Sequence, residues 1–339
     1  MKVVKFGGTS VRSAQRMKEV AKLITDGEQK IVVLSAMSGT TNTLVEISDY
    51  LYKKNPEGAN EIINRLEAKY KQHVNELYST DEYKQKTQEF IKAQFDYIRS
   101  YTKDIFTLFE EKVILAQGEL ISTNMVTNYL QEQGVNAILL PALEFMRTDK
   151  NSEPDPVYIK EKLAAQLEIH PDAEIYITQG FICRNAYGEI DNLQRGGSDY
   201  TASLIGAAVN ASEIQIWTDI DGMHDNDPRI VDKTSPVRHL HFEEAAELAY
   251  FGAKILHPTC VQPAKYANIP VHLLNTMEPT APGQNQGSCS QRQHHCRQDQ
   301  IKPYVTGPRL LAQSIRNLRK LSDIYRHDLY FRGRCFRIH

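Results

Sequence analysis

Two glycine pairs in this sequence are followed by small polar residues in a way that suits anion binding. Gly7 and Gly8 lie in KFGGTS, and Gly196 and Gly197 lie in QRGGSDYTAS. A glycine loop between a buried strand and a helix brings backbone N–H groups close to an anion, and the helix amino terminus adds positive potential. Two such loops predict two anionic groups facing each other, as in phosphoryl transfer. Neither loop has the spacing of a P-loop or of a dinucleotide fingerprint.

Charged residues flank both loops. Lys5 stands in an apolar strand, where a lysine is rarely buried without a partner, so we expect it to reach a negative ligand at the strand end. A simple glycine turn with a lysine that extends to solvent is the alternative. Arg195 suits bidentate binding of a carboxylate or phosphate. Asp199 follows Ser198, a predicted N-cap, and alone would indicate only a favourable contact with the helix dipole.

A third charged stretch is WTDIDGMHDNDPR at 217–229, with four aspartates after a predicted strand. It could be a solvated turn. Its DxDG core is faintly similar to a calcium loop, but the later positions do not fit an EF-hand and no Glu stands at the twelfth position. In FGAKILHP, Lys254 at a helix end could contact a phosphate, although alone it indicates only a contact with the helix carboxyl terminus.

The elements that must position these residues alternate along the chain. Short apolar runs predict strands at 3–6, 30–35, 136–141, 174–181, 213–219 and 269–276. Helical spacing or composition predicts helices at 11–24, 57–131, 157–168, 198–211 and 242–255. This alternation predicts an α/β fold with a mostly parallel sheet and helices on both faces. Ligands of such sheets bind beyond the carboxyl ends of the strands, where the glycine loops fall.

The composition is that of an ordinary globular protein. Of the 339 residues, 41% are hydrophobic and 24% are charged. No apolar run approaches the length of a transmembrane helix, and the N-terminus has no signal-peptide core. The odd number of cysteines, five, argues against a disulfide framework. We therefore expect a cytoplasmic protein that binds no membrane.

Taken together, the motifs resemble one enzyme family. In order, and at these separations, KFGGTSV, VVLSAMSGTTNTL, AQGELIS, ITQGF, QRGGSDYTA, WTDIDG, DPR and FGAKILHP closely resemble the aspartate kinases of the amino-acid kinase superfamily. The resemblance covers residues 1–283. It implies a catalytic domain with the superfamily fold, a three-layer αβα sandwich around a mostly parallel sheet.

The resemblance also implies an activity and its residues. The reaction would transfer the γ-phosphoryl group of MgATP to the side-chain carboxylate of L-aspartate, giving 4-phospho-L-aspartate, the first step towards lysine, threonine and methionine. Lys5 would neutralise the transferred group and Asp199 would orient Lys5 or the metal ion; no side chain is assigned as a direct metal ligand. Glu119 would hold the substrate ammonium and Arg195 its α-carboxylate. The positions matching substrate contacts are Ser35, Thr41, Glu119, Arg195 and Ser198, and those matching nucleotide contacts are Lys5, Gly7, Gly8, Thr218, Asp219, His224, Arg229 and Lys254.

Two alternatives remain open. The chain could phosphorylate another amino-acid carboxylate such as that of glutamate, although the full motif set favours aspartate. It could also be an inactive nucleotide-binding module, because it lacks the regulatory ACT domains of its relatives. Those relatives form homo-oligomers, whereas we expect this chain to be monomeric or prone to aggregation, since surface that packs on the ACT domains would be exposed.

The stretch 284–339 differs from the rest of the chain. It has nine Arg, two Lys, three Asp and no Glu, a net charge of +8, against −10 for 1–283. Codons can be chosen for 289–302 and 316–339 so that a reading one nucleotide later gives ACT-like sequence. We therefore interpret this basic tail as a poorly ordered remnant of an ACT domain, read out of frame.

Within the tail, GSCSQRQHHCRQDQ contains two cysteines and two histidines close together. A C-x6-C spacing with HH between lacks a usual zinc pattern, so we interpret the cluster as an accident of codons rather than a metal site. A basic arm that binds nucleic acid is a still less favoured interpretation.

Overall fold

The computed structural model describes residues 1–103, 105–193, 196–219, 237, 239–250, 258–279 and 287–289. All of these belong to one compact unit, Met1–Gln291. Four of the predicted site residues lie outside the described residues: Arg195, His224, Arg229 and Lys254. The predicted tail and its Cys/His cluster also lie outside them, except for Gly287–Cys289.

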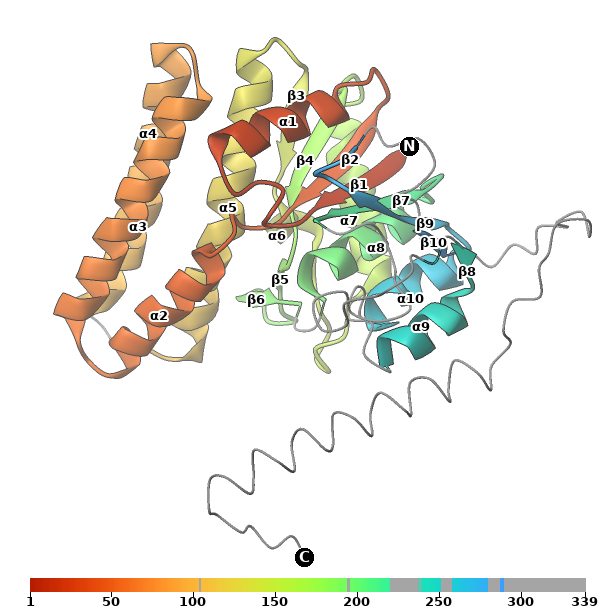
Figure 1. The fold of residues 1–339 in the computed structure, drawn as a ribbon. Coiled ribbons are helices and arrows are strands. Elements are labelled where there is room, and N and C mark those ends of the chain that lie inside the picture. Colours follow the sequence, from red (N-terminus) through yellow and green to blue (C-terminus); the bar gives the residue numbers. More distant parts are fainter. Residues whose placement is uncertain are drawn as a thin grey trace, which may run out of the picture. The chain divides into compact units, whose positions relative to one another are not determined.

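A mostly parallel eight-stranded sheet forms the centre of this unit (Figure 1). The strand order is β3–β4–β2–β1–β7–β9–β10–β8, and among the described strands of this sheet the β9–β10 pair is antiparallel. The strands are β1 (Lys2–Phe6), β2 (Lys30–Leu34), β3 (Ala137–Leu140), β4 (Ile175–Gln179), β7 (Ile214–Thr218), β8 (His239–Leu240), β9 (Val271–Asn275) and β10 (Gly287–Cys289). Every predicted strand forms, which confirms the α/β prediction.

Two features of the sheet were not predicted. β10 falls inside the predicted tail, yet it pairs with β9 and β8, so these three residues belong to the sheet. A separate antiparallel hairpin, β5 (Ile182–Arg184) and β6 (Ile190–Asn192), follows β4 and leads to the second glycine loop.

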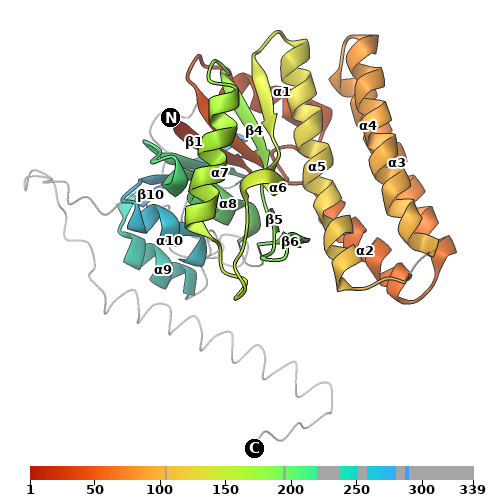
Figure 2. The same cartoon turned by 180° about the vertical axis from the view of Figure 1, so that it is seen from behind.

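Helices cover both faces of the sheet. Helix α1 (Ala14–Ile24) lies over the face seen in Figure 1, and α7 (Pro156–Ile169) and α8 (Gly197–Ala208) lie over the opposite face, seen in Figure 2. The other helices are α2 (Thr40–Tyr52), α3 (Pro56–Leu77), α4 (Asp81–Ser100), the 3-10 turn Tyr101–Lys103, α5 (Leu108–Glu132), α6 (Ala142–Phe145), α9 (Phe242–Tyr250) and α10 (Pro258–Tyr266). The three-layer αβα arrangement implied by the family resemblance is therefore confirmed.

The alternation of side chains along β1 explains where Lys5 points. Val4 and Phe6 pack into the hydrophobic core beneath α1 and α5, whereas Val3 packs into the core beneath α7 and α8. Because successive side chains of a strand point to opposite faces, Lys5 shares the face of Val3. Its side chain is therefore directed toward the layer that contains α8.

The predicted helical layer at 57–131 consists of three helices, α3, α4 and α5. Asn55 caps α3 by accepting from Gly58 N, and Thr107 and Glu110 form a capping box at the start of α5. Figure 1 shows α3 and α4 side by side as a hairpin next to α5. This layer supplies α5, the helix that carries Glu119.

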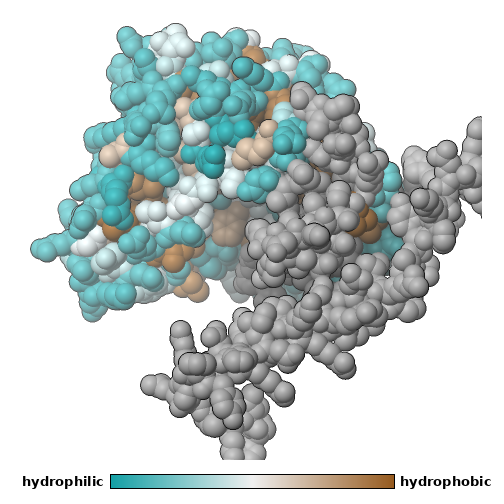
Figure 3. Space-filling view, in the orientation of Figure 1, coloured by the Kyte–Doolittle hydropathy of each residue, from teal (hydrophilic) through white to brown (hydrophobic). Residues whose placement is uncertain are grey.

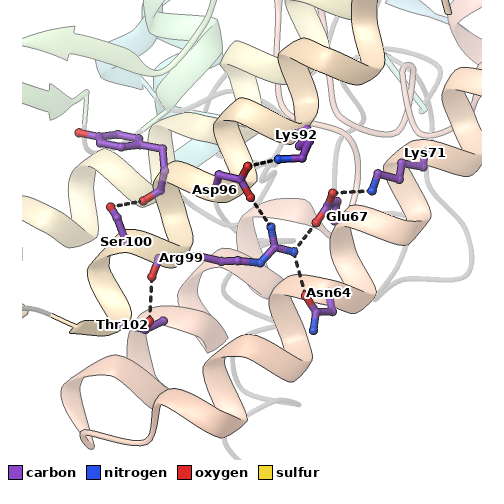
Figure 4. Close-up of polar contacts among 9 residues, drawn as sticks. Asn64, Glu67, Lys71, Lys92, Asp96, Arg99, Ser100 and Thr102 are labelled. Atoms are coloured by element: carbon purple, nitrogen blue, oxygen red, sulfur yellow. Dashed lines mark hydrogen bonds and ion pairs between the residues drawn. The ribbon is translucent and has the colours of Figure 1, made fainter. Parts of the chain in front are cut away.

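An ion-pair cluster ties α3 to α4 (Figure 4). Arg99 contacts Glu67, and its guanidinium also lies 3.0 Å from Asp96 and 2.8 Å from Asn64. Lys71 Nζ lies 2.6 Å from the same Glu67 carboxylate. Burial alone would raise the pKa of Glu67, but hydrogen bonds from Lys71 and Arg99 hold that pKa below its ordinary value.

Glu67→Gln should lower the free energy of unfolding at pH 7 by about 1 kcal/mol, because it removes the ionic contacts of Glu67 with Lys71 and Arg99, which solvent partly screens. The folded-state pKa of Glu67 lies below the unfolded value, so its stabilising effect is present above pH 4.5 and is lost as the pH falls through the folded value. Urea denaturation at pH 7 and pH 3 measures this. Asp96→Asn, at an exposed position of α4, is the control with little effect. A Glu67→Gln deficit that persists at pH 3 would contradict the ionic explanation.

The face of the described residues seen in Figure 3 is mainly polar. Hydrophilic residues dominate the coloured part of Figure 3, and hydrophobic residues form small separate patches there. Among the described residues, no helix is both long enough and apolar enough to cross a membrane.

Candidate active site

The carboxyl end of β1 places Lys5 beneath the first glycine loop. β1 lies between β2 and β7, with Lys5 opposite Val33 and Ile216. The Lys5 side chain is 11% exposed, and its Nζ lies 2.6 Å from Asp199 Oδ1. The same Nζ lies 3.6 Å from the position that a Cβ on Gly7 would occupy. A cation and its carboxylate partner are thus held next to backbone that can approach an anion.

Gly8 brings the first glycine loop into contact with the loop after β2. A Cβ on Gly8 would lie 2.7 Å from Ala36 O and 3.3 Å from Ser38 N, so the two backbones are too close for any other residue. Ser38 N donates to Gly8 O at 3.1 Å, and Gly7 N donates to Trp217 O at 3.3 Å. Within the described structure, Gly8 N has no acceptor. It is therefore the N–H of this glycine pair that remains available to a ligand.

A cavity of about 330 Å³ lies beside this loop. Its walls are mostly small or polar side chains and come from the ends of β1, β2 and β4 and from α2, α5 and α8. They are Gly8, Ser35, Ala36, Met37, Ser38, Gly39, Thr41, Asn42, Glu119, Phe181, Gly197 and Ser198. The volume and polarity suit a small, charged metabolite.

Glu119 is the ionisable side chain among the described residues that line this cavity. One carboxylate oxygen, Oε1, accepts from Ala36 N at 3.0 Å. The other, Oε2, is buried, and no described group donates to it. Burial raises the pKa of Glu119 to about 7, against a smaller opposing effect of the Ala36 hydrogen bond. An unpaired buried carboxylate is costly, so this site is suited to receive a cation.

The second glycine loop forms the opposite wall. Gly196 adopts a left-handed conformation (φ 81°) and starts α8, which places Ser198 and Asp199 in the first helical turn. Ser35 Oγ donates to Ser198 Oγ at 2.9 Å, so the loop after β2 and the start of α8 are joined directly. Asp199 then projects to Lys5 from the same turn. Both glycine loops therefore contribute to the wall of the cavity, through Gly8 and Gly197.

The end of β7 lies next to the first glycine loop. Phe6 pairs with Trp217, and the Gly7–Trp217 hydrogen bond continues this pairing past the strand end. Thr218 Oγ1 donates to Asp219 Oδ1 at 3.2 Å, and the Asp219 side chain is exposed. Both residues thus lie beside the loop of Gly7 and Gly8, outside the cavity.

In a comparison with known protein families, the amino acid kinase family matches residues 1–275, which include every described residue of the site. The chain belongs to the amino acid kinase family. Arabidopsis thaliana aspartokinase 1, chloroplastic, is 36% identical to it over 297 residues, covering 83% of this chain and 51% of that protein. The lysine-sensitive aspartokinase 3 of Escherichia coli (strain K12) is 34% identical over 285 residues, covering 83% of this chain and 63% of that protein.

A solved structure is also similar to this amino acid kinase. E. coli aspartokinase III, in complex with aspartate and ADP, is 31% identical with a TM-score of 0.77, covering 87% of this chain and 65% of that one. The chain thus spans between half and two thirds of the length of these relatives.

The described site residues of this amino acid kinase gather in two adjoining places. The cavity contains Ser35, Thr41, Glu119 and Ser198 in its wall, and the Lys5–Asp199 pair stands beside the glycine loops. Thr41 lies in the first turn of α2. Gly39, in a left-handed conformation (φ 83°), is the N-cap of that helix, which the sequence analysis did not predict.

Several site residues were not predicted individually. Ala36 takes part through its backbone N–H, which no side-chain pattern can indicate. Gly180 and Phe181 stand in the recognised ITQGF motif, but their roles follow only from the structure. Phe181 has a positive φ (67°) and its N–H donates to Thr201 Oγ1 at 3.0 Å, so a bulky residue is held in a rarely used conformation at the cavity wall.

Proposed function

We propose that this amino acid kinase transfers the γ-phosphoryl group of MgATP to the side-chain carboxylate of L-aspartate, forming ADP and 4-phospho-L-aspartate. The observation that carries the proposal is the unpartnered, buried Glu119 oxygen in a small polar cavity that adjoins the Lys5–Asp199 pair. An α-amino acid offers the ammonium group that this oxygen lacks. The similarity to aspartokinases, one of them in complex with aspartate and ADP, supports aspartate as that amino acid.

In this proposal each end of aspartate has its own partner. Glu119 receives the ammonium, and the Ser35, Thr41 and Ser198 hydroxyls line the space beside it. Arg195, which lies outside the described residues, is proposed to bind the α-carboxylate by a bidentate contact. Fixing both α-substituents directs the side-chain carboxylate toward the first glycine loop and positions it for attack.

The chemical step needs little beyond positioning and charge neutralisation. A carboxylate is already a nucleophile at neutral pH, so no general base is required. Its oxygen attacks the γ-phosphorus, the bond from that phosphorus to the β–γ bridging oxygen breaks, and the electron pair leaves with ADP. Lys5, held by Asp199, and Gly8 N stabilise the charge on the transferred phosphoryl group.

The nucleotide is proposed to lie along the ends of β1 and β7. Gly7 and Gly8 would approach its phosphates, and Thr218 and Asp219 would contact the nucleotide from the end of β7. His224, Arg229 and Lys254 are proposed as further nucleotide contacts on the family resemblance alone. Mg²⁺ enters with ATP as part of the substrate.

The direct test is an ATP-dependent hydroxamate assay, in which hydroxylamine traps the acyl phosphate, with L-aspartate and L-glutamate in parallel. Product with aspartate only is the expected result. Product with glutamate only would mean that glutamate, not aspartate, is the substrate. MgADP binding without product from either acid would favour the inactive nucleotide-binding module. Neither binding nor product from folded protein would overturn the proposal.

The nature of residues 284–339 stays a separate proposal, namely that they are an ACT-domain remnant read out of frame after a catalytic domain at 1–283. Sequencing the gene across 283–287 tests it. If the gene encodes residues 284–339 in the same reading frame as residues 1–283, and related genes share this tail, the frameshift proposal is wrong.

Gly180→Ala should impair catalysis while leaving the fold intact. A Cβ on Gly180 would collide with the Ser198 side chain and lie 2.9 Å from Ser198 Cα, so the start of α8 must move. Because positioning contributes strongly to phosphoryl transfer, kcat/KM for aspartate should fall by about 10- to 100-fold. Gly206→Ala is the matched control, since its Cβ would crowd Ile214 Cγ1 at 2.7 Å, away from the cavity. Equal losses of kcat/KM in the two variants would contradict the prediction.

A further inference from the structure

Thr276 stands where the two proposed nucleotide loops meet. It directly follows β9, and β9 pairs with β7 in a parallel register that places Asn275 opposite Thr218. β7 in turn pairs with β1, so the carboxyl ends of β1, β7 and β9 are neighbours. A residue just beyond β9 can therefore contact both the end of β7 and the loop that follows β1.

Hydrogen bonds join Thr276 to both of these loops. Its backbone N and its Oγ1 donate to Thr218 O at 2.8 and 3.0 Å. Its Oγ1 also lies 2.8 Å from the Oγ of Ser10, the residue that completes the GGTS motif. The three residues come from distant parts of the sequence, 266 positions apart in the case of Ser10 and Thr276.

The chemistry of a hydroxyl fixes the direction of these bonds. A threonine hydroxyl has one hydrogen, and a carbonyl oxygen can only accept. Since the Thr276 hydroxyl donates to Thr218 O, the Ser10 hydroxyl must donate to Thr276 Oγ1. The result is a directed chain, from Ser10 through Thr276 to the Thr218 carbonyl.

Burial makes this chain costly to break. Ser10 is 0% exposed and Thr276 is 3% exposed, so water cannot readily replace a lost partner. Ser10 N donates to Gly7 O at 3.0 Å, which closes the turn that contains Gly8. Arg16 Nη2 donates to Thr276 O at 3.2 Å and holds the threonine from its other side.

We propose that Thr276 is a positioning residue for the nucleotide, which fixes the GGTS loop relative to Thr218 and Asp219. The assignment of these loops to the nucleotide rests on the proposed function. None of the hydrogen bonds of Thr276 reaches the cavity residues proposed to bind aspartate. Loss of the chain should therefore weaken nucleotide binding selectively.

The test compares Thr276→Val, Thr276→Ser and Ser10→Ala with the wild-type chain. Isothermal titration calorimetry measures the Kd for MgADP, and the hydroxamate assay measures KM for ATP and for aspartate. Thr276→Val removes two hydroxyl contacts and should raise the Kd for MgADP and the KM for ATP about 3- to 30-fold, with KM for aspartate changed less than about twofold. Thr276→Ser should restore both values. Ser10→Ala breaks the same chain from the other end and should weaken MgADP binding in the same direction.

Thr127→Val is the control for loss of a buried threonine hydroxyl. Its Oγ1 donates to Thr123 O at 2.8 Å within α5, and Thr127 is 4% exposed. This variant should bind MgADP as the wild type does, even where its thermal stability falls.

The outcomes separate this inference from the proposed function. Wild-type affinity for MgADP in both Thr276→Val and Ser10→Ala, failure of Thr276→Ser to restore binding, or an equal rise in both KM values would overturn the role of Thr276. If the wild-type chain binds MgADP but phosphorylates no amino acid, the proposed function fails while calorimetry still tests the inference. If it binds no MgADP, both are overturned.

Discussion

Replacing Lys5 with methionine should lower kcat for aspartyl phosphate formation by about a thousandfold. Lys5 Nζ lies beside the first glycine loop and 2.6 Å from Asp199 Oδ1, where it is proposed to contact the transferred phosphoryl group. Charge on the transferred phosphoryl group spreads over its oxygens in the transition state, and a preorganised cation in a site of low exposure stabilises that charge strongly. Methionine approximates the apolar stem of lysine and removes the ammonium group, with its charge and its hydrogen-bond donors.

The kinetic signature distinguishes this role from simple loss of binding. An interaction that is made mainly in the transition state lowers kcat and kcat/KM together. We therefore expect KM for aspartate to change little in Lys5→Met, as measured by the hydroxamate assay. Asp199→Asn should also lower kcat, because Lys5 loses the partner that orients it, but by less than loss of the ammonium itself.

Lys30→Met is the matched control for Lys5→Met. Lys30 is also a buried lysine paired with an aspartate, Asp26, and its side chain is 3% exposed. It lies at the amino end of the neighbouring strand β2, away from the strand ends that form the site. Its replacement should reduce stability and leave kcat close to that of the wild type. A similar loss of kcat in both variants would mean that Lys5 acts through the fold rather than on the phosphoryl group.

The sheet and the position of Lys5 could be predicted because both depend on local pattern. Buried parallel strands are continuous apolar runs, and KVVKF and KIVVL show this plainly. A lysine inside such a run needs a partner, and the family resemblance implied Asp199 as the residue that would orient it, which the ion pair bears out. The glycine pairs then marked the strand ends at which ligands bind.

Other features depended on contacts that the sequence does not display. β5 and β6 are three-residue strands without a regular hydrophobic pattern, so nothing local distinguished them from a loop. The hydrogen bonds from Ala36 N to Glu119 and from Ser35 to Ser198 join residues 83 and 163 positions apart. Such pairs follow from the packing of α5 and α8 against the strand ends and appear only in three dimensions.

Glu119→Gln should raise KM for aspartate by about a hundredfold while leaving KM for ATP nearly unchanged. Glutamine keeps an oxygen that can accept from Ala36 N, so the geometry of the cavity is retained. It removes the negative charge that is proposed to bind the substrate ammonium, and loss of a buried charge-assisted contact is worth a few kcal/mol. The assay with varied aspartate measures this directly.

The pH dependence supplies a second measurement for the same residue. Burial raises the pKa of Glu119 to about 7, and only the ionised form can pair with the ammonium. KM for aspartate should therefore rise as the pH falls below about 7, approaching tenfold per pH unit, and level off above it. Glu119→Gln has no group to titrate there, so its KM should lose this dependence.

Glu119→Gln should raise the stability of the fold at pH 8 even though it impairs aspartate binding. Because the folded-state pKa of Glu119 lies above its unfolded value of 4.5, its favourable contribution is present below pH 4.5 and is lost as the pH rises through about 7. Glu119→Gln should therefore be more stable than the wild type at pH 8, on the order of 2 kcal/mol by urea denaturation. Glu67→Gln, which removes a carboxylate with a lowered pKa, should be less stable at pH 8 and keep its KM for aspartate.

Glu119→Gln is thus expected to raise the free energy of unfolding at pH 8 and to weaken aspartate binding. A carboxylate retained inside the cavity at a cost to folding needs a compensating role, and binding a cation from the substrate supplies one. If Glu119→Gln binds aspartate as the wild type does, the ammonium has another partner and the orientation proposed for the substrate is wrong. If it loses aspartate binding without gaining stability, the carboxylate is better solvated in the free protein than its burial implies. If Glu119→Gln is both more stable than the wild type and unable to bind aspartate, Glu119 is the residue that binds the α-ammonium group.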